Sequence, residues 1–498
     1  HPESEGPAEP AESSDPAPDE ESPPIAEPPP RTGVGRSTMM TVGAVLLALL
    51  SALAIWYARQ TESGEGGRDA AGSSAAPMVA SDAGRADGET ADVDTSDGGA
   101  EALVFGESDE EPAQHAARAV EAAREAVRKG RGRRRRAEAY LEAEAWEPAR
   151  RMAIRLMAEK GRTEGLETIY RRSIEEDESL YPETVTIGAD EKVGKIYALG
   201  GGWSISFRMT KGGRSAYAFK PSQQRWKEGW RAEIAAYRLC EIIACHFDVP
   251  RNRPARVSKE TFDELYGRVD GEHQTEYREE RFDDLIWQTE TGPDGEERKY
   301  LYGTLKDWVP EFVKWPIEYE SVWRPWLSPE SDSDILQKPF TESLAPLKEK
   351  GEETFYDNII EQRDGVGTRG MARQLSSLLV FDFLISNWDR FSTAEKYYGV
   401  NNQFADGRFI SLDNGAGFPQ YHFDVVARRL EPVGRFSRQT VVSIRALDPM
   451  FVNPVLFPSP SLGERGRLAT FWDQRRAFLD LINQLRAEYG NEAVFAFR

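Results

Sequence analysis

The stretch FLISNWDRF, residues 383–391, decides the fold when it is read with ISLDNGAGF, residues 410–418. The first stretch ends an apolar run that predicts a buried helix, and it brings Asp389 and Arg390 to the end of that helix. The second predicts a short strand that ends at Asp413, followed by a glycine turn. Either aspartate alone is an ordinary helix-end or turn residue. Together they predict two carboxylates held near each other by a rigid core.

Upstream, residues 195–221 read KIYALGGGWSISFRMTKGGRSAYAFKP and predict three short strands with glycine turns between them. Gly200, Gly201 and Gly202 form the first turn. Glycine lets backbone N–H groups approach a polyphosphate closely, although most glycine turns are only turns. Lys220 is the last residue of the third strand. The segment therefore has the composition of a flap that covers phosphates.

The next segment, WRAEIAAYRLCEIIACHF at residues 230–247, predicts an amphipathic helix that carries Glu233. A lysine on a strand and a glutamate on a helix are the parts from which kinases build the ion pair that holds the α- and β-phosphates of ATP. An ordinary surface pair is the alternative. The two aspartates that follow favour phosphoryl transfer, because one can accept the proton of an incoming hydroxyl while the other holds a metal.

Several motifs in a fixed order extend this pattern. They are AFKP, AEIAAYRLCEII followed by DVPRNRPARV, YGTLKDWVP, FDFLISNWDR and LDNGAGF. In this order they resemble the atypical kinases of the secretory pathway, the group of the Golgi casein kinase, the xylosyl kinase of proteoglycan synthesis and four-jointed. More distantly, they are similar to spore-coat kinases and bacterial persistence-toxin kinases. The resemblance covers roughly residues 190–430.

The resemblance implies an α+β fold of the two-lobed protein-kinase type, with an N-lobe at 181–310 and a C-lobe at 311–498. It implies ATP as the cofactor, with Mg or Mn, and a protein Ser/Thr or a sugar hydroxyl as the acceptor. Asp389 would be the catalytic base, and Asp413 would bind the metal.

The same resemblance assigns the nucleotide contacts. Lys220 and Glu233 would form the nucleotide ion pair, and the glycine loop would cover the phosphates. GTLKDWVP, residues 303–310, would be the hinge near the adenine. These roles come from the family and not from composition or periodicity.

One residue departs from the family pattern. The catalytic Asp-Arg pair of the family is commonly followed by His, whereas Phe391 stands at that position in this chain. The retained acidic and Lys-Glu positions favour an active enzyme; the alternative is a catalytically weak or inactive pseudokinase scaffold that binds nucleotide. Trp315, Trp323 and Trp326 follow the hinge, where packing is the ordinary role and a sugar-stacking platform the alternative.

The N-terminal part has a different composition. Residues 1–37 are Pro-rich and acidic and predict a disordered tail, and residues 58–113 predict a flexible linker. Between them, TMMTVGAVLLALLSALAIWY at 38–57 is twenty residues long without a charge, which predicts a transmembrane helix and a single-pass membrane protein. Equal numbers of arginines flank the two sides of the segment, so the side on which the kinase-like domain lies stays open.

Residues 114–180 predict a helical arm, interrupted by the basic run RKGRGRRRR at 128–136. A solvated helix face and turn is the favoured interpretation of the run, and a nucleic-acid or lipid contact is the alternative. The chain has 84 acidic and 63 basic residues and a formal net charge of −21, which argues against a broad nucleic-acid-binding surface. Cys240 and Cys245 lie five apart in a predicted helix and point to different faces, so no disulfide is expected.

Overall fold

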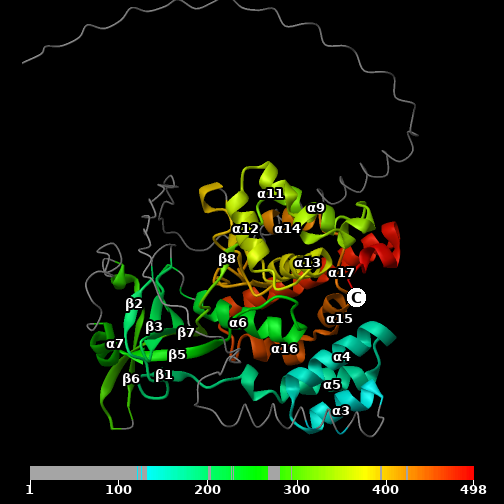
Figure 1. Cartoon of the computed structure of the whole chain (residues 1–498). Helices are drawn as coiled ribbons and strands as arrows, with labels where there is room; N and C mark the ends of the chain where they lie inside the picture. The colour runs from blue at the N-terminus through cyan, green and yellow to red at the C-terminus, as the bar shows by residue number, and fades with distance from the viewer. Residues whose placement is uncertain are drawn as a thin grey trace, which may run out of the picture. The chain divides into compact units, whose positions relative to one another are not determined.

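The structure is a computed structural model, and all the residues that it describes belong to one unit, Glu89–Arg498 (Figure 1). The described residues are 121, 125, 132–199, 204–225, 227, 229–266, 281–292, 294–392, 395–421 and 424–497. The predicted tail at 1–37 and the predicted linker at 58–113 lie outside them.

Seven strands form one mixed sheet with the order β1-β5-β7-β4-β3-β2, and β6 pairs with β7 outside that row (Figure 1). The strands are β1 (Val185–Ile187), β2 (Ile196–Ala198), β3 (Phe207–Lys211), β4 (Arg214–Pro221), β5 (Asn252–Ser258), β6 (Trp287–Thr291) and β7 (Glu297–Asp307). The three strands predicted between residues 195 and 221 are present as β2, β3 and β4. Helix α7 (Lys259–Tyr266) follows β5 directly.

One face of this sheet carries its own hydrophobic core. Phe207 on β3 lies opposite Phe219 on β4, and Phe219 lies opposite Leu305 on β7. All three side chains are fully buried. Because side chains alternate along a strand, the residues next to them point to the other face of the sheet. That other face meets helix α6 (Gly229–Ile243).

The second part of the unit is mostly helical and surrounds a long buried helix, α13 (Thr368–Leu384). The helices around it are α9 (Glu320–Leu327), α10 (Phe340–Ser343), α11 (Ala345–Glu349), α12 (Glu353–Glu361), α14 (Asp424–Leu430), α15 (Arg438–Ala446), α16 (Pro449–Leu456) and α17 (Leu462–Val494). A small sheet, β10-β9-β8, is built from β8 (Val313–Lys314), β9 (Gln403–Ala405) and β10 (Arg408–Ile410). Every residue of α13 from Gln374 to Leu384 is buried, as expected for a helix inside a core.

The three tryptophans that follow the sheet belong to this core. Trp315, Trp323 and Trp326 are each at most 1% exposed. The ring of Trp315 packs against Phe404 and Phe409 of the small sheet. They pack the core and do not present a sugar-stacking platform.

The predicted helical arm is packed into the same core. It contains α3 (Arg133–Glu142), α4 (Trp146–Lys160) and α5 (Glu164–Glu175), and α4 lies against α15 (Figure 1). Arg150 of α4 is buried and donates to the backbone carbonyls of Glu241 and Ser173. Tyr170 of α5 also donates to the backbone carbonyl of Ile242 at the end of α6, and its ring packs against Phe451 of α16, so buried contacts join the arm to the core.

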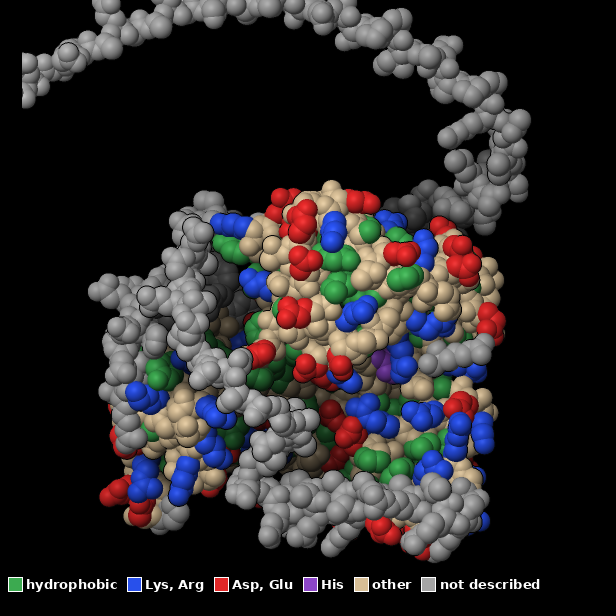
Figure 2. Space-filling model, viewed as in Figure 1, with side chains coloured by type: hydrophobic (Ala, Val, Ile, Leu, Met, Phe, Trp, Pro, Cys, Tyr) green, Lys and Arg blue, Asp and Glu red, His purple; other side chains and the backbone are tan. Residues whose placement is uncertain are grey.

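The part of the basic run that the structure describes is paired with acidic side chains. Arg133 lies 2.5 Å from the Glu159 carboxylate, and Arg134 lies 3.0 Å from that of Glu138. Lys and Arg side chains are interspersed with Asp and Glu on the face shown in Figure 2. These pairs favour the solvated-face interpretation of residues 133–136, while residues 128–131 lie outside the described residues.

The prediction of a single-pass membrane protein has to be corrected. Residues 38–57, on which it rested, lie outside the described residues. Within the part of the chain that the structure does describe, no helix combines the length and the apolar character needed to cross a bilayer. The longest, α17, spans 33 residues but carries charged side chains on successive turns. The predicted fold class, an α+β two-lobed fold behind a transmembrane helix and an arm, is replaced by a mixed α/β structure with two sheets.

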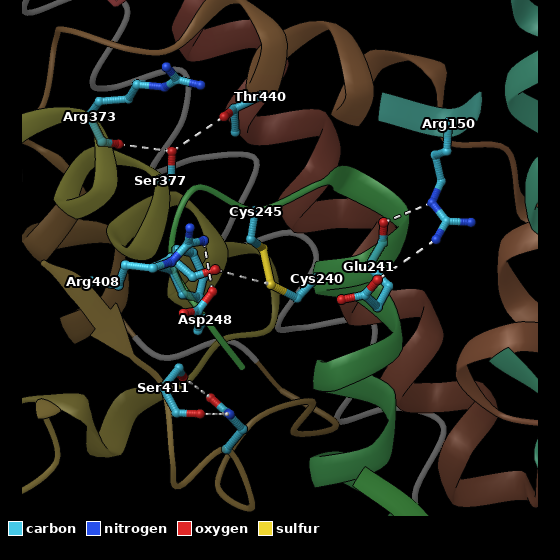
Figure 3. The surroundings of a disulfide bond; sticks show 12 residues. Arg150, Cys240, Glu241, Cys245, Asp248, Arg373, Ser377, Arg408, Ser411 and Thr440 are labelled. Carbon is cyan, nitrogen blue, oxygen red and sulfur yellow. Dashed lines mark hydrogen bonds and ion pairs between the residues drawn. A yellow bond between two sulfur atoms is a disulfide. The ribbon is translucent and has the colours of Figure 1, made fainter. Parts of the chain in front are cut away.

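The expectation of no disulfide was wrong, because Cys240 and Cys245 are bonded to each other (Figure 3). The expectation assumed that the helix continues through residue 247. In the structure α6 ends at Ile243, and Ala244 has a φ of +51°. The chain therefore turns back after the helix, and the two Cα atoms lie 5.1 Å apart, within the range that a disulfide spans.

Candidate active site

Two lysines project from the helix-facing side of the large sheet. In the register of β4 and β7, Lys220 lies opposite Thr304, and Ala218 lies opposite Lys306. Side chains two residues apart on a strand share a face, so Lys220 and Lys306 lie on the same side of the sheet. Phe219 and Leu305, between these positions, point into the core on the other side. The alternation of apolar and polar residues along β4 and β7 therefore sets the direction of both amines.

Helix α6 brings Glu233 to the two lysines. The Lys220 Nζ atom lies 3.0 Å from Glu233 Oε1, and the Lys306 Nζ atom lies 3.0 Å from Glu233 Oε2. The Glu233 side chain has no exposed surface. Each carboxylate oxygen thus has its own ammonium partner, which is the arrangement that a buried carboxylate requires.

The segment after β10 adds the fourth charge. Asp413 Oδ1 lies 2.7 Å from the Nζ atom of Lys220, and Lys306 donates to the backbone carbonyl of Leu412. Unlike Glu233, the Asp413 side chain is 47% exposed. The structure therefore brings together the predicted residues Lys220, Glu233 and Asp413, and Asp413 is the one whose side chain is half exposed to solvent.

These contacts shift the pKa values of the charged groups. Burial by itself lowers the pKa of the Lys220 amine, but the carboxylates of Asp413 and Glu233 outweigh it and raise this pKa. Burial by itself raises the pKa of Asp413, but the Lys220 and Lys306 ammonium groups hold it well below its usual range. Both groups are therefore charged at neutral pH.

Asp389 lies in the turn that follows α13. Ser386 has a φ of +53°, and Asn387 then accepts a hydrogen bond from the backbone N–H of Asp389 at 3.3 Å. The Asn387 amide also donates to the backbone carbonyl of Asp413 at 3.5 Å, which connects the two predicted aspartate segments. Sequence reasoning noted Asn387 only as part of the helix end.

The charge of Asp389 depends on its surroundings. Burial and the negative charge of Asp413 raise its pKa to about 6, although the cations of Lys220, Arg390 and Arg429 act in the opposite direction. A carboxylate with a pKa of about 6 is ionised at neutral pH but is more basic than an ordinary aspartate. It therefore suits the role of a proton acceptor.

Arg390, next to the candidate base, is buried and fully engaged. Its guanidinium contacts both oxygens of Asp382 at 2.9 and 3.1 Å. It also donates to the Asn401 carbonyl, the Ser411 hydroxyl and the Asn414 amide oxygen. Each guanidinium nitrogen of Arg390 thus has a partner inside the protein, and the residue fastens α13 to the segment around Asp413. The partners Asp382 and Asn414 were missed as a network, since only tertiary structure brings them together.

Phe391, at the position where the kinases that the motifs resemble commonly have His, lies under an arginine. The guanidinium carbon of Arg429 on α14 lies 4.3 Å from the centre of the Phe391 ring. The Arg429 Nη1 atom donates to the carbonyl of Trp388 at 2.8 Å. The aromatic ring thus holds a cation close to Asp389.

Two further nucleotide contacts were predicted, the glycine loop and the hinge. Gly200, Gly201 and Gly202 lie outside the described residues. In the predicted hinge, residues 303–307 belong to β7, and the backbone N–H groups of Asp307 and Trp308 bond to the carbonyls of Arg251 and Ala216. The backbone N–H groups of Asp307 and Trp308 are therefore already used within the fold.

The metal prediction rests on a small set of donors. Among the described residues, no group of three or more His, Cys, Asp or Glu side chains is placed to hold a metal ion. The carboxylate of Asp413 is half exposed and is a group that Mg²⁺ commonly binds. Mg²⁺ often takes only one or two carboxylates, together with water and substrate phosphates. The residues fit such a shared site and not an all-protein cage.

Comparisons with known proteins add no assignment to this site. No family model matches the chain, and no curated protein matches it. The interpretation of the site rests on its residues and their geometry.

Proposed function

We propose that this chain is a kinase that transfers the γ-phosphate of ATP to a hydroxyl group of a protein Ser/Thr or of a sugar. The observation that carries the proposal is the contact of Lys220 with both Glu233 and Asp413, at 3.0 and 2.7 Å, beside a half-buried Asp389. A lysine in this setting can bind phosphate oxygens while a nearby carboxylate accepts a proton.

Each residue has a role in this proposal. Lys220 neutralises the α- and β-phosphates and is positioned by Glu233. Asp413 would hold a Mg²⁺ or Mn²⁺ ion, which would neutralise negative charge on the phosphates. Asp389 orients the acceptor hydroxyl and takes up its proton, and its pKa of about 6 leaves it ionised for that purpose. Arg390 keeps Asp389 and Asp413 in register through Asp382 and Asn414.

The direct test uses the purified full chain with ATP labelled at the γ-phosphate, in Mg²⁺ or Mn²⁺. Dephosphorylated casein serves as the protein acceptor, a methyl xyloside serves as the sugar acceptor, and release of labelled phosphate to water is followed in parallel. We expect transfer that falls by about 10²- to 10⁴-fold in Asp389→Asn, as is typical for loss of a general base. Asp263→Asn, on the exposed face of α7, is the matched control.

Absence of transfer and hydrolysis in the wild type, or equal rates in Asp389→Asn, would refute the proposal.

A pseudokinase scaffold is the second candidate, and Phe391 is the observation that favours it. It predicts that ATP raises the melting temperature, since a ligand that binds only the folded state stabilises it, while turnover stays at background.

A further inference from the structure

Lys306 is a charged residue of the site to which the sequence motifs assign no role. It lies on β7 inside the segment predicted as the hinge, and it is 9% exposed. Its amine contacts Glu233 Oε2 at 3.0 Å and donates to the Leu412 carbonyl. A lysine is rarely buried without a specific partner, so these two contacts account for its position.

The two lysines share Glu233 but differ in their other contact. Lys220 reaches Asp413, a half-exposed carboxylate on the open side of the site. Lys306 reaches a backbone carbonyl, which carries no net charge and has no other role in the proposed reaction. If Lys220 moves toward a phosphate, Glu233 keeps one ammonium partner. Without Lys306, the same movement would leave a fully buried carboxylate with no cation beside it.

We propose that Lys306 is a positioning residue that serves as the permanent partner of Glu233 and so frees Lys220 to bind phosphate. The inference rests on the proposed function, because it requires a polyphosphate ligand at Lys220. It assigns different roles to the two lysines: Lys306 neutralises Glu233 in both the empty and the occupied site, whereas Lys220 moves from Glu233 and Asp413 toward the ligand. Lys306 does not itself contact the substrate.

This division has a consequence that a purely structural role would not have. In Lys306→Met, Lys220 becomes the only ammonium partner of Glu233, and phosphate must compete with a buried carboxylate for it. Binding of ATP should therefore weaken, whereas binding of adenosine, which has no phosphate, should stay the same. A general loss of packing would affect both ligands.

The test is a set of titrations of ATP and adenosine into the full chain by isothermal calorimetry, with melting curves as a check on folding. We expect Lys306→Met to bind ATP about tenfold more weakly, the size of effect associated with one charge-assisted contact, and to bind adenosine as the wild type does. Lys306→Arg keeps a cation and should recover part of the ATP affinity. Lys211→Met, which removes a lysine that pairs with Glu191 in the same sheet, is the control and should change neither affinity.

A second variant keeps the test informative if Lys306→Met does not fold. In Glu233→Gln the buried charge is gone, and adding Lys306→Met should change ATP binding by less than about twofold, because residues that act through each other are not additive. Wild-type ATP affinity in Lys306→Met, equal losses for ATP and adenosine, or a full further loss in the double variant would overturn the role of Lys306 while leaving the proposed function in place. Absence of ATP binding by the wild type would instead remove the proposed function and, with it, this inference.

Discussion

Two clusters of charge lie side by side in this molecule, and they differ in how completely their groups are paired. Around Arg390, the guanidinium meets Asp382, Ser411, Asn401 and Asn414, and the two charged side chains are almost completely buried. Around Lys220, by contrast, one carboxylate is fully buried and the other is 47% exposed. In the first cluster each guanidinium nitrogen is hydrogen-bonded inside the protein, whereas the second cluster has a carboxylate that a ligand can reach.

This difference separates a structural role from a functional one. A buried ion pair whose donors are all satisfied holds elements together, and any ligand would have to break it. A cluster with one exposed carboxylate can accept a cation or release a lysine to a phosphate at little cost in desolvation. We call the buried cluster of Arg390 and Asp382 the closed cluster, and the partly exposed cluster of Lys220, Glu233 and Asp413 the open cluster. The Asp-Arg pair at the end of α13 belongs to both, because Arg390 lies in the closed cluster and Asp389 lies beside the open one.

The largest expected effect comes from breaking the closed cluster. Asp382→Ala would leave Arg390 buried without a counter-charge, and we expect it to lower the free energy of unfolding by about 3–5 kcal/mol. Asp413→Ala, in the open cluster, should cost about 1 kcal/mol or less, since its side chain is half exposed. Guanidinium unfolding of both variants, compared by the shift in midpoint, measures the difference. Equal losses would mean that the two clusters do not differ as described.

A smaller effect is expected at the disulfide that follows Glu233 on α6. The bond between Cys240 and Cys245 closes a short loop at the helix end (Figure 3). Loop-closure entropy for so short a loop predicts that Cys240→Ala combined with Cys245→Ala lowers the free energy of unfolding by about 2 kcal/mol. Dithiothreitol should produce a similar shift in the wild type and none in the double variant. A wild type that is insensitive to dithiothreitol under conditions that reduce the bond would contradict this prediction.

The sequence predicted the open cluster better than the closed one, for a physical reason. Lys220 lies near the end of a strand, Glu233 in the first turns of a helix and Asp413 shortly after a strand, and local patterns indicate all three elements. Lys306 was missed because its role depends on the register of β4 against β7, which sequence alone does not determine. The alternation in YLYGTLKD was the available signal, since it places Lys306 on the same face as Thr304.

The errors in the sequence interpretation also have identifiable causes. The disulfide was missed because the helix was extended past Ile243, and a turn at Ala244 is not visible in a run of helix-forming residues. The packing of the arm against the core, through buried residues such as Ile154 and Tyr170, is a tertiary property that no single-sequence pattern reports.

The open cluster should also respond to pH. Asp389 must be ionised to accept a proton, and its pKa is raised to about 6, so kcat/KM should rise about tenfold per pH unit below pH 6 and level off above it. Arg429→Met removes a cation that favours the ionised form and should move the midpoint to higher pH. Arg428→Met, one position away on the exposed face of α14, should leave the profile unchanged. Initial rates between pH 4.5 and 8 provide the measurement, and a profile that is flat below pH 6 would rule out Asp389 as the base.

The smallest effect is expected at Phe391. In the sequence, this residue is the one that favours a pseudokinase over an active kinase. Because the Phe391 ring supports Arg429 through its face at 4.3 Å, Phe391→His should lose about 0.5–1 kcal/mol of unfolding free energy and change the transfer rate only slightly. Phe391→Leu, which keeps an apolar side chain but not the π face, should lose a similar amount of stability. If Phe391 instead disables the site, Phe391→His will raise the transfer rate by an order of magnitude or more. The wild type, Phe391→His and Phe391→Leu should therefore be compared in the same labelled-ATP assay. Their transfer rates decide whether the aromatic ring is compatible with phosphate transfer or prevents it.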